Sequence, residues 1–222
     1  MADRMRDLLW RGVAEIYRGI CAHPFVTGLT DGSLHHDRFG YYVVQDAHYL
    51  RQYARALAVC AAKAPGEAEL AMFAEHAGAA IAAERQLHAE LLTGLGLDAG
   101  HAAAVPVGPA TQAYTSYLLA TVYGGCYAEA VAAVLPCYWI YARVGEHLQQ
   151  RGSPDPLYQR WIDMYAGQEF QTVVSAVLEV TDRIGAQASL HEKDLMRNHF
   201  HTTARYEWMF WDAAYRMADW PV

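Results

Sequence analysis

One stretch of the sequence places an acid among tyrosines. Tyr42, Asp46, Tyr49 and Tyr53 follow one another at intervals of four, three and four residues, so a helix would carry them on one face. A carboxylate on an aromatic, core-facing stripe is costly to bury unless it is paired. Asp46 is therefore either a structural acid bonded to tyrosine hydroxyls or an acid used in chemistry, and the residue types leave both interpretations open.

A second stretch, Leu135-Pro136-Cys137-Tyr138-Trp139-Ile140-Tyr141, places a thiol directly after a proline. A proline inside a helix removes one amide hydrogen bond and opens the preceding turn, which predicts that the carbonyl of Ala132 lacks its helical donor. Tyr141 lies one turn beyond Cys137 on the same face. Most buried cysteines are small core residues, so the spacing alone favours a packing role for Cys137, with a nucleophilic role as the alternative.

A third stretch, Tyr206-Glu207-Trp208-Met209-Phe210-Trp211, places a second acid in apolar surroundings. Burial there would raise the pKa of Glu207, because the charged form loses its hydration. A carboxyl group with a raised pKa can donate a proton near neutral pH. The alternative is a structural glutamate bonded to a tyrosine or to an arginine such as Arg205.

All three stretches belong to segments whose composition favours helix. Glycine and proline divide the chain into predicted helices at about 3–21, 37–64, 67–93, 112–123 and 126–151, two more on either side of Ala166-Gly167 that end near Gly185, and a last one up to about 217. Ser189 and Glu192 form a predicted capping box at the start of the last helix. Segment 23–33 is expected to be rich in turns and segment 94–109 to be a loop. No strand pattern is seen, so we expect a single all-α domain over residues 1–222, an up-and-down helical bundle.

Composition and charge exclude several classes of protein. The chain has 222 residues and is 54% hydrophobic, above the roughly 45–50% of soluble domains, which allows a large core and apolar surface for oligomerisation. The net charge is −7 and the only lysines are Lys63 and Lys193. Without a basic face, no binding to nucleic acid is expected.

The apolar run 130–142 is shorter than the roughly 18 residues that a membrane span needs, so it predicts a buried core helix and no membrane segment. The N-terminus lacks a signal-peptide pattern. The cysteines form no C-x-x-C pair, which favours free thiols in a reducing compartment, most simply the cytoplasm. They are Cys21, Cys60, Cys126 and Cys137.

Histidines and acids elsewhere give weaker signals. A metal site could be imagined from Glu75, His76, Glu84 and His88, but the chain has no Glu-x-x-His pair, which carboxylate-bridged di-iron bundles use. We interpret these four residues as a solvated helix face and expect no metal site. The pairs His35-His36 and His199-x-His201 are interpreted as surface or capping residues.

Taken together, the motifs resemble the thiaminase II (TenA) family. The resemblance covers nearly the whole chain, in order and with compatible spacing, and Cys137 places it in the cysteine-containing branch. The motifs that carry it are Val44-Gln45-Asp46-x-x-Tyr49-Leu50, Leu135-Pro136-Cys137-Tyr138-Trp139-x-Tyr141 and Tyr206-Glu207-x-x-Phe210-Trp211, with His23-Pro24-Phe25-Val26, Asp31-Gly32-Ser33-Leu34 and Tyr114-Thr115-Ser116.

This resemblance implies a haem-oxygenase-like helical bundle without haem, assembled as a homotetramer. It implies hydrolysis of the exocyclic C–N bond at the methylene of 4-amino-5-aminomethyl-2-methylpyrimidine, and of thiamin. The product would be 4-amino-5-hydroxymethyl-2-methylpyrimidine, which re-enters thiamin synthesis. No metal or other cofactor is implied.

The resemblance also implies roles for individual residues. Cys137 would add to C6 of the pyrimidine, Glu207 would protonate ring nitrogen N1, and Asp46 would bond the 4-amino group and orient or activate the thiol. The tyrosines that would line the pocket are Tyr49, Tyr114, Tyr141 and Tyr165. Two other functions remain open, a metal-dependent oxidase of the same helical superfamily and a pyrimidine-binding protein without turnover.

Overall fold

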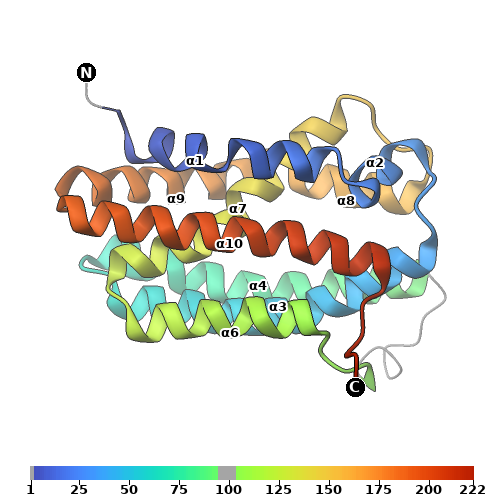
Figure 1. Cartoon of the computed structure of the whole chain (residues 1–222), viewed down its shortest axis with the longest axis horizontal. Helices are drawn as coiled ribbons and strands as arrows, with labels where there is room; N and C mark the ends of the chain where they lie inside the picture. The colour runs from blue at the N-terminus through green and yellow to red at the C-terminus, as the bar shows by residue number, and fades with distance from the viewer. Residues whose placement is uncertain (1–2, 95–103) are drawn as a thin grey trace.

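The computed structural model describes residues 3–94 and 104–222, with the side chains of 83–93 left aside, and its described part is helical without strands (Figure 1). The predicted all-α class is confirmed. The helices are α1 (Met5–Cys21), α2 (Pro24–Asp31), α3 (His36–Lys63), α4 (Glu67–Gly94), α6 (Pro109–Gly124), α7 (Tyr127–Gln149), α8 (Pro156–Ala166), α9 (Gln168–Gln187) and α10 (Leu190–Arg216).

The prediction that segment 23–33 is rich in turns is wrong, because helix α2 occupies most of this segment. The ring of His23 accepts a hydrogen bond from the amide of Phe25, and Pro24 takes the first helical position, where its fixed φ suits a helix. Gly32 ends α2 in the left-handed region with φ of 73°. Most of the predicted loop 94–109, namely 95–103, lies outside the described residues.

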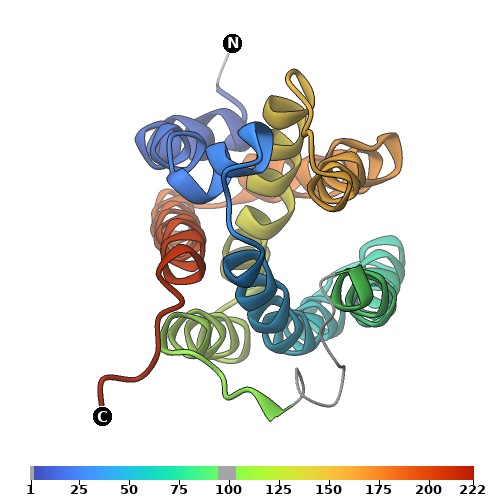
Figure 2. The same ribbon diagram turned by 90° about the vertical axis from the view of Figure 1, so that its right-hand side faces the viewer.

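Helix α7 lies in the middle of the bundle. Seen end on, it runs between α10 on one side and α8 on the other (Figure 2), and it packs against both, as well as against α1, α3, α6 and α9. Its residues 130–136 are all buried, so the predicted buried core helix is confirmed. A side chain in this helix can therefore face several neighbouring helices.

The backbones of α7 and α8 approach closely at Gly145. A methyl group there would lie 2.6 Å from the carbonyl carbon of Tyr165 and 2.7 Å from the amide nitrogen of Ala166. Only glycine fits such an approach without moving one helix. Gly145 is one turn after Tyr141, so the close contact brings α8 against the face of α7 that carries Tyr141.

Gln45 fastens the start of α6 to α3. Its amide group donates to the carbonyl of Pro106 at 3.0 Å and accepts from the amide of Gly108 at 2.9 Å. The predicted capping box at the start of α10 is confirmed, since Ser189 and Glu192 exchange hydrogen bonds of 2.8 and 3.2 Å. These bonds fix where α6 and α10 begin relative to the core.

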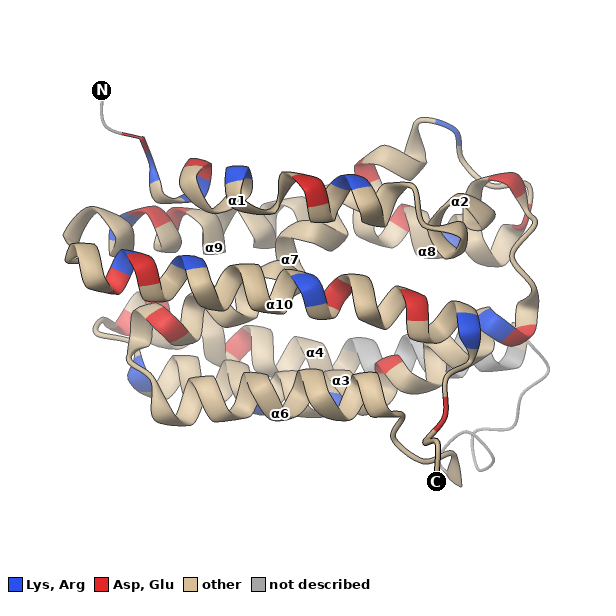
Figure 3. Ribbon diagram, in the orientation of Figure 1, with Lys and Arg blue, Asp and Glu red and all other residues tan. Residues whose placement is uncertain are grey.

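Charged side chains are unevenly distributed over the helices. Acidic and basic segments alternate along α1 and α10, whereas α6 carries no charged residue (Figure 3). Within the described residues, no helix is both long enough and apolar enough to span a bilayer.

Candidate active site

Three helices bring the two predicted acids and the predicted thiol together. Asp46 comes from α3, Cys137 from α7 and Glu207 from α10. Asp46 and Glu207 are 4% and 1% exposed. The charges of both acids act on the thiol of Cys137, and Asp46 also acts on Glu207. The bundle therefore gathers into one cluster three groups that are far apart in the sequence.

The four predicted tyrosines surround this cluster. The rings of Tyr49 and Tyr114 lie 4.9 Å apart, and those of Tyr141 and Tyr165 lie 4.8 Å apart. Tyr49, Tyr114 and Tyr141 are buried, and Tyr165 is half-buried. The structure thus brings together all seven residues singled out from the sequence.

The partner of Glu207 is a hydroxyl group, and no ion pair to Glu207 is found among the side chains that the structure describes. The hydroxyl of Tyr114 donates to Oε1 of Glu207 at 2.7 Å. Burial raises the pKa of Glu207 to about 8, with a smaller contribution from the charge of Asp46, while the bond from Tyr114 opposes the rise. Arg205, the partner considered from the sequence, is exposed. Glu207 therefore keeps its proton near neutral pH.

Cys137 rests as a thiol. Burial raises its pKa well above the ordinary value, and the negative charges of Glu207 and Asp46 add to that rise. The hydroxyls of Tyr49 and Tyr53 lie close enough to oppose it. Cys137 is half-buried between the buried residues Pro136 and Tyr138, so it retains accessible surface deep in the bundle. A reaction at this thiol requires a group that takes its proton.

Two buried polar atoms near the cluster have no hydrogen bond of good geometry. They are the hydroxyl oxygen of Tyr49 and Nε1 of Trp211. An unsatisfied buried polar group costs about 1–3 kcal/mol. A polar ligand between the aromatic rings would offset this cost, which is one reason to regard the cluster as a binding site.

Trp161, which no sequence motif pointed to, completes an aromatic wall behind the cluster together with Tyr42 and Trp211. Tyr42 and Trp211 stack at 5.3 Å with an angle of 6° between their planes. Nε1 of Trp161 donates to the hydroxyl of Tyr42 at 3.4 Å, and that hydroxyl donates to Tyr141 at 3.4 Å. Trp161 precedes Tyr165 by four residues in α8, and this helical spacing is the signal that could have identified it.

Two histidines differ from their predicted surface roles. His76 does not lie on a solvated face, because it is half-buried and its Nδ1 lies 3.0 Å from the hydroxyl of Tyr138. His199 lies between Tyr117 and Glu129, at 2.8 and 3.1 Å. Burial against a neighbouring helix, which spacing within one helix cannot reveal, explains both differences.

The remaining predictions concern His35 and the residues considered for a metal site. His35 caps α3 as expected, accepting from the amide of Asp37 at 3.3 Å. The side chains of Glu84 and His88 lie outside the described residues. Over the side chains that the structure describes, no group of three or more His, Cys, Asp or Glu residues is placed to hold a metal ion.

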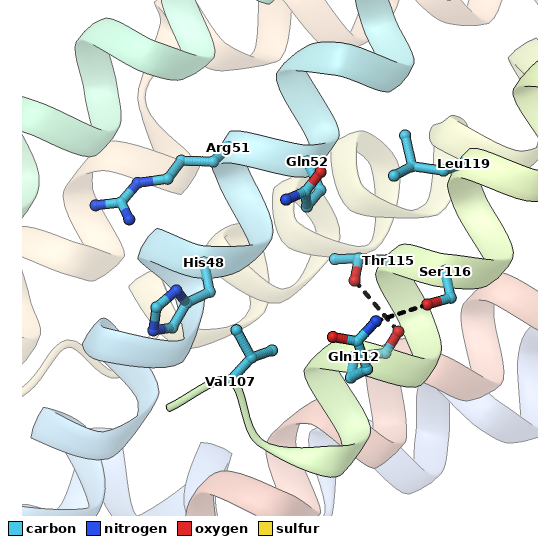
Figure 4. Close-up of a pocket in the computed structure, with 8 residues that line it drawn as sticks. All are labelled: His48, Arg51, Gln52, Val107, Gln112, Thr115, Ser116 and Leu119. Atoms are coloured by element: carbon cyan, nitrogen blue, oxygen red, sulfur yellow. Dashed lines mark hydrogen bonds between the residues drawn. The ribbon is translucent and has the colours of Figure 1, made fainter. Parts of the chain in front are cut away.

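A separate polar hollow of about 370 Å³ lies between α3 and α6. Figure 4 shows His48, Arg51 and Gln52 on one side of it and residues of α6 on the other. His48 and Thr115 line this hollow, whereas the adjacent residues Tyr49 and Tyr114 belong to the central cluster. The remaining lining residues are Val107, Gln112, Ser116 and Leu119.

Comparison with known proteins identifies the family of this chain. The model of the TENA/THI-4/PQQC family matches residues 10–217 of the chain. The chain belongs to that family. Among the relatives, an aminopyrimidine aminohydrolase of Bacillus subtilis is 36% identical over 207 residues, which are 93% of this chain and 88% of the relative. The resemblance seen in the sequence motifs is thereby confirmed at the level of the family.

Solved structures support the fold. A TenA homologue protein from P. horikoshii OT3 has a TM-score of 0.89 and 31% sequence identity, covering 96% of this chain and 99% of that one. A domain with a heme oxygenase-like fold from Shewanella denitrificans OS217 has a TM-score of 0.77 at 15% identity, covering 98% and 94%. The predicted haem-oxygenase-like bundle is confirmed, and this family member carries its acid–thiol cluster inside it.

Proposed function

We propose that this protein is an aminopyrimidine aminohydrolase that uses Cys137 as a covalent catalyst. Its substrate would be 4-amino-5-aminomethyl-2-methylpyrimidine, and also thiamin, cleaved at the exocyclic C–N bond. The product would be 4-amino-5-hydroxymethyl-2-methylpyrimidine, released for thiamin salvage. The name of the Bacillus subtilis relative, aminopyrimidine aminohydrolase, agrees with this substrate class.

One observation carries the proposal, the meeting of a thiol, a protonated acid and a second acid inside a wall of aromatic rings. A thiol supplies a nucleophile, and a carboxyl group with a raised pKa supplies a proton. These groups supply covalent and acid–base catalysis from the chain's own residues, so we expect hydrolysis without a metal or an organic cofactor.

In the proposed reaction the sulfur of Cys137 adds to C6 of the pyrimidine ring. Glu207 gives its proton to N1, which accepts electrons as the C–S bond forms. Asp46 bonds the 4-amino group and helps to orient or activate the thiol. The protonated amine then leaves as ammonia, and water adds at the exocyclic carbon while its proton passes to the Glu207 carboxylate. Cys137 departs and N1 loses its proton, which restores the aromatic ring.

The tyrosines fit a flat aromatic ligand. Aromatic rings provide apolar faces on which a heterocycle can stack, and the hydroxyls among them can orient it by hydrogen bonding. The hydroxyl of Tyr49, which has no hydrogen bond of good geometry, faces this cluster. We assign ligand binding to Tyr49, Tyr114, Tyr141 and Tyr165.

Ammonia release from the aminopyrimidine, measured beside cleavage of thiamin, tests the function. We expect turnover of the aminopyrimidine that persists in the presence of a chelator. Ligand binding without any product would favour a pyrimidine-binding protein. Activity that a chelator abolishes and iron or manganese restores would favour the metal-dependent oxidase.

We also propose that the protein is a homotetramer in a reducing compartment, most simply the cytoplasm. The helix α6 carries no charge and exposes Gln112, Ser116, Ala120 and Tyr123 along one side, and interface centres are poor in charged residues. All four cysteines are free thiols. Light scattering that gives a monomer at micromolar concentration would contradict the tetramer.

A further inference from the structure

The thiol of Cys137 must lose its proton when it reacts, and one face of α7 offers a path for that proton towards the surface. Tyr138 follows Cys137 directly and is 5% exposed. Its hydroxyl lies 3.0 Å from Nδ1 of His76, a half-buried residue of α4. A histidine at such a position can exchange protons with solvent through its second ring nitrogen.

Tyr53 closes the gap between the thiol and this pair. Its hydroxyl lies near both the Cys137 thiol and the Tyr138 hydroxyl and lowers the pKa of each, against the larger effect of burial. The rings of Tyr53 and Tyr138 are 5.7 Å apart and meet edge to face. The hydroxyl also donates to the carbonyl of Val134 at 2.9 Å, and rotation about the C–O bond can turn that hydrogen towards Tyr138.

We propose that Tyr138 and His76 form a proton relay that connects Cys137, through Tyr53, with solvent. This inference rests on the proposed covalent function of Cys137. His76 and Tyr138 are positioning residues in it, because both act on Cys137 through Tyr53. The relay uses the side of α7 that faces α3 and α4, away from the acid Glu207 of α10.

The relay balances the protons of the covalent step. As the sulfur bonds to ring carbon C6, the S–H bond breaks and the proton passes to the oxygen of Tyr53. The proton of Tyr53 passes to Tyr138, and that of Tyr138 passes to Nδ1 of neutral His76, which becomes an imidazolium. When the thiol departs at the end of the reaction, the three transfers reverse. Nothing is oxidised or reduced.

Burial keeps His76 in the neutral form that can receive a proton, and it makes the imidazolium acidic enough to pass that proton on to solvent. The pKa of His76 is lowered by its burial, against a smaller opposing effect from the charge of Glu75 on the same helix. His76 is therefore neutral near pH 7 and has a free lone pair for a proton. The centre of its ring lies 6.3 Å from the centre of the Phe73 ring. This apolar neighbour holds His76 beside Tyr138.

The chain contains a matched control for the relay. His199 and Tyr117 form a second, part-buried histidine–tyrosine pair with a contact of 2.8 Å between Nδ1 and the hydroxyl. The thiol of Cys137 is not among the groups that this pair contacts. His199→Phe thus removes the same kind of bond from the same bundle without touching the proposed path.

The test compares His76→Phe, Tyr138→Phe and His199→Phe by single-turnover rate and by alkylation of Cys137 with iodoacetamide, followed by mass spectrometry. We expect both rates to fall about tenfold in the first two variants, below the 10²–10⁴ typical of a direct general acid or base. His199→Phe should keep both rates. The double variant His76→Phe/Tyr138→Phe should lose no more than either single one, because both act in one path.

Imidazole separates a relay from simple packing. Added imidazole should restore the rate of His76→Ala, which a purely structural histidine would not allow. The relay is overturned if His76→Phe matches His199→Phe in both rates, or if imidazole has no effect on a slowed His76→Ala. Absence of turnover in the unmodified protein would overturn the proposed function instead, and alkylation of Cys137 would still decide the relay.

Discussion

Two clusters that each contain a tyrosine and a glutamate lie along α6 and α10. The pKa of the glutamate is raised in one cluster and lowered in the other. In the first, Tyr114 donates to Glu207 at 2.7 Å in the buried centre. In the second, three residues further along α6, Tyr117 contacts His199, which in turn contacts Glu129 at 3.1 Å. The second cluster is only partly buried, with His199 and Glu129 side chains 19% and 17% exposed.

The two pKa values differ because the two carboxyl groups accept different hydrogen bonds. Burial raises the pKa of Glu207, and one tyrosine hydroxyl does not offset it. Burial would also raise the pKa of Glu129, but hydrogen bonds from Cys126 and the contact with His199 outweigh it, so that its pKa is lowered. Glu207, which accepts one tyrosine hydroxyl, thus has a raised pKa, whereas Glu129, which accepts from the amide of Cys126 and contacts His199, has a lowered one and caps α7.

The largest effect on the central cluster should come from Cys137→Ala. Loss of the nucleophile should lower turnover by roughly 10³-fold or more, since the remaining groups cannot form the covalent intermediate. The melting temperature should change little, because only one sulfur atom is removed. Cys21→Ala, at another half-buried thiol, should keep full activity. Comparable turnover in the two variants would contradict the covalent mechanism.

Glu207→Gln should have the next largest effect, a fall in rate constant of roughly 10²–10⁴. The amide keeps the shape of the side chain but has no acidic proton for the ring nitrogen. Substrate binding should weaken less, because the amide can still donate a hydrogen bond. A structural glutamate would give the opposite pattern, a lower melting temperature with near-normal single-turnover rate in the folded fraction.

The raised pKa of Glu207 also predicts how stability varies with pH. Its folded-state pKa of about 8 exceeds the ordinary 4.5, so the folded state binds the proton more tightly. Its stabilising contribution is complete below pH 4.5, declines as the pH rises, and is lost above about pH 8. The slope for one such group is at most about 1.4 kcal/mol per pH unit.

Denaturant unfolding of the original protein and of Glu207→Gln, repeated between pH 5 and 8, measures this slope. The original protein should lose stability relative to the variant as the pH rises. Parallel stability curves for the two proteins would mean that Glu207 has an ordinary pKa, and the contrast with Glu129 would disappear.

Glu129→Ala should have the smallest effect on chemistry. It removes the bond to the amide of Cys126 at the start of α7, which should cost about 1 kcal/mol of stability. Since the pKa of Glu129 is lowered, its contribution is present above its ordinary pKa and is lost on acidification. Turnover per folded molecule should stay unchanged, and a large loss of turnover would show that the two clusters are coupled.

Much of the fold could be predicted from the sequence because its signals are local. Glycines, prolines and the capping box of Ser189 and Glu192 mark most helix ends within a few residues of their observed positions. Helix α2 was missed because the sequence His23-Pro24 is also typical of a turn. The hydrogen bond from the amide of Phe25 to the ring of His23 decides for helix, and it depends on a side-chain orientation that sequence spacing does not give.

The sequence predicted which site residues share one face of a helix, but it did not predict which side chains of different helices touch. Intervals of three and four residues identify a face, such as that of Asp46 and Tyr49, and a resemblance to a family supplied the link between faces. Contacts made across helices without such a motif were missed. Trp161 against Tyr42 and His76 against Tyr138 are two examples, since each depends on how α8 or α4 packs against its neighbours.

Gly145 sets how closely the aromatic rings of α8 lie to Tyr141. Because the backbones of α7 and α8 touch there, with room for a hydrogen atom and none for a methyl group, a larger residue would push α8 outward. Tyr165 and Trp161 would move with it, away from Tyr141, and the contacts between these rings would be lost. The spacing of these three rings is therefore set at a residue whose own side chain is a single hydrogen atom.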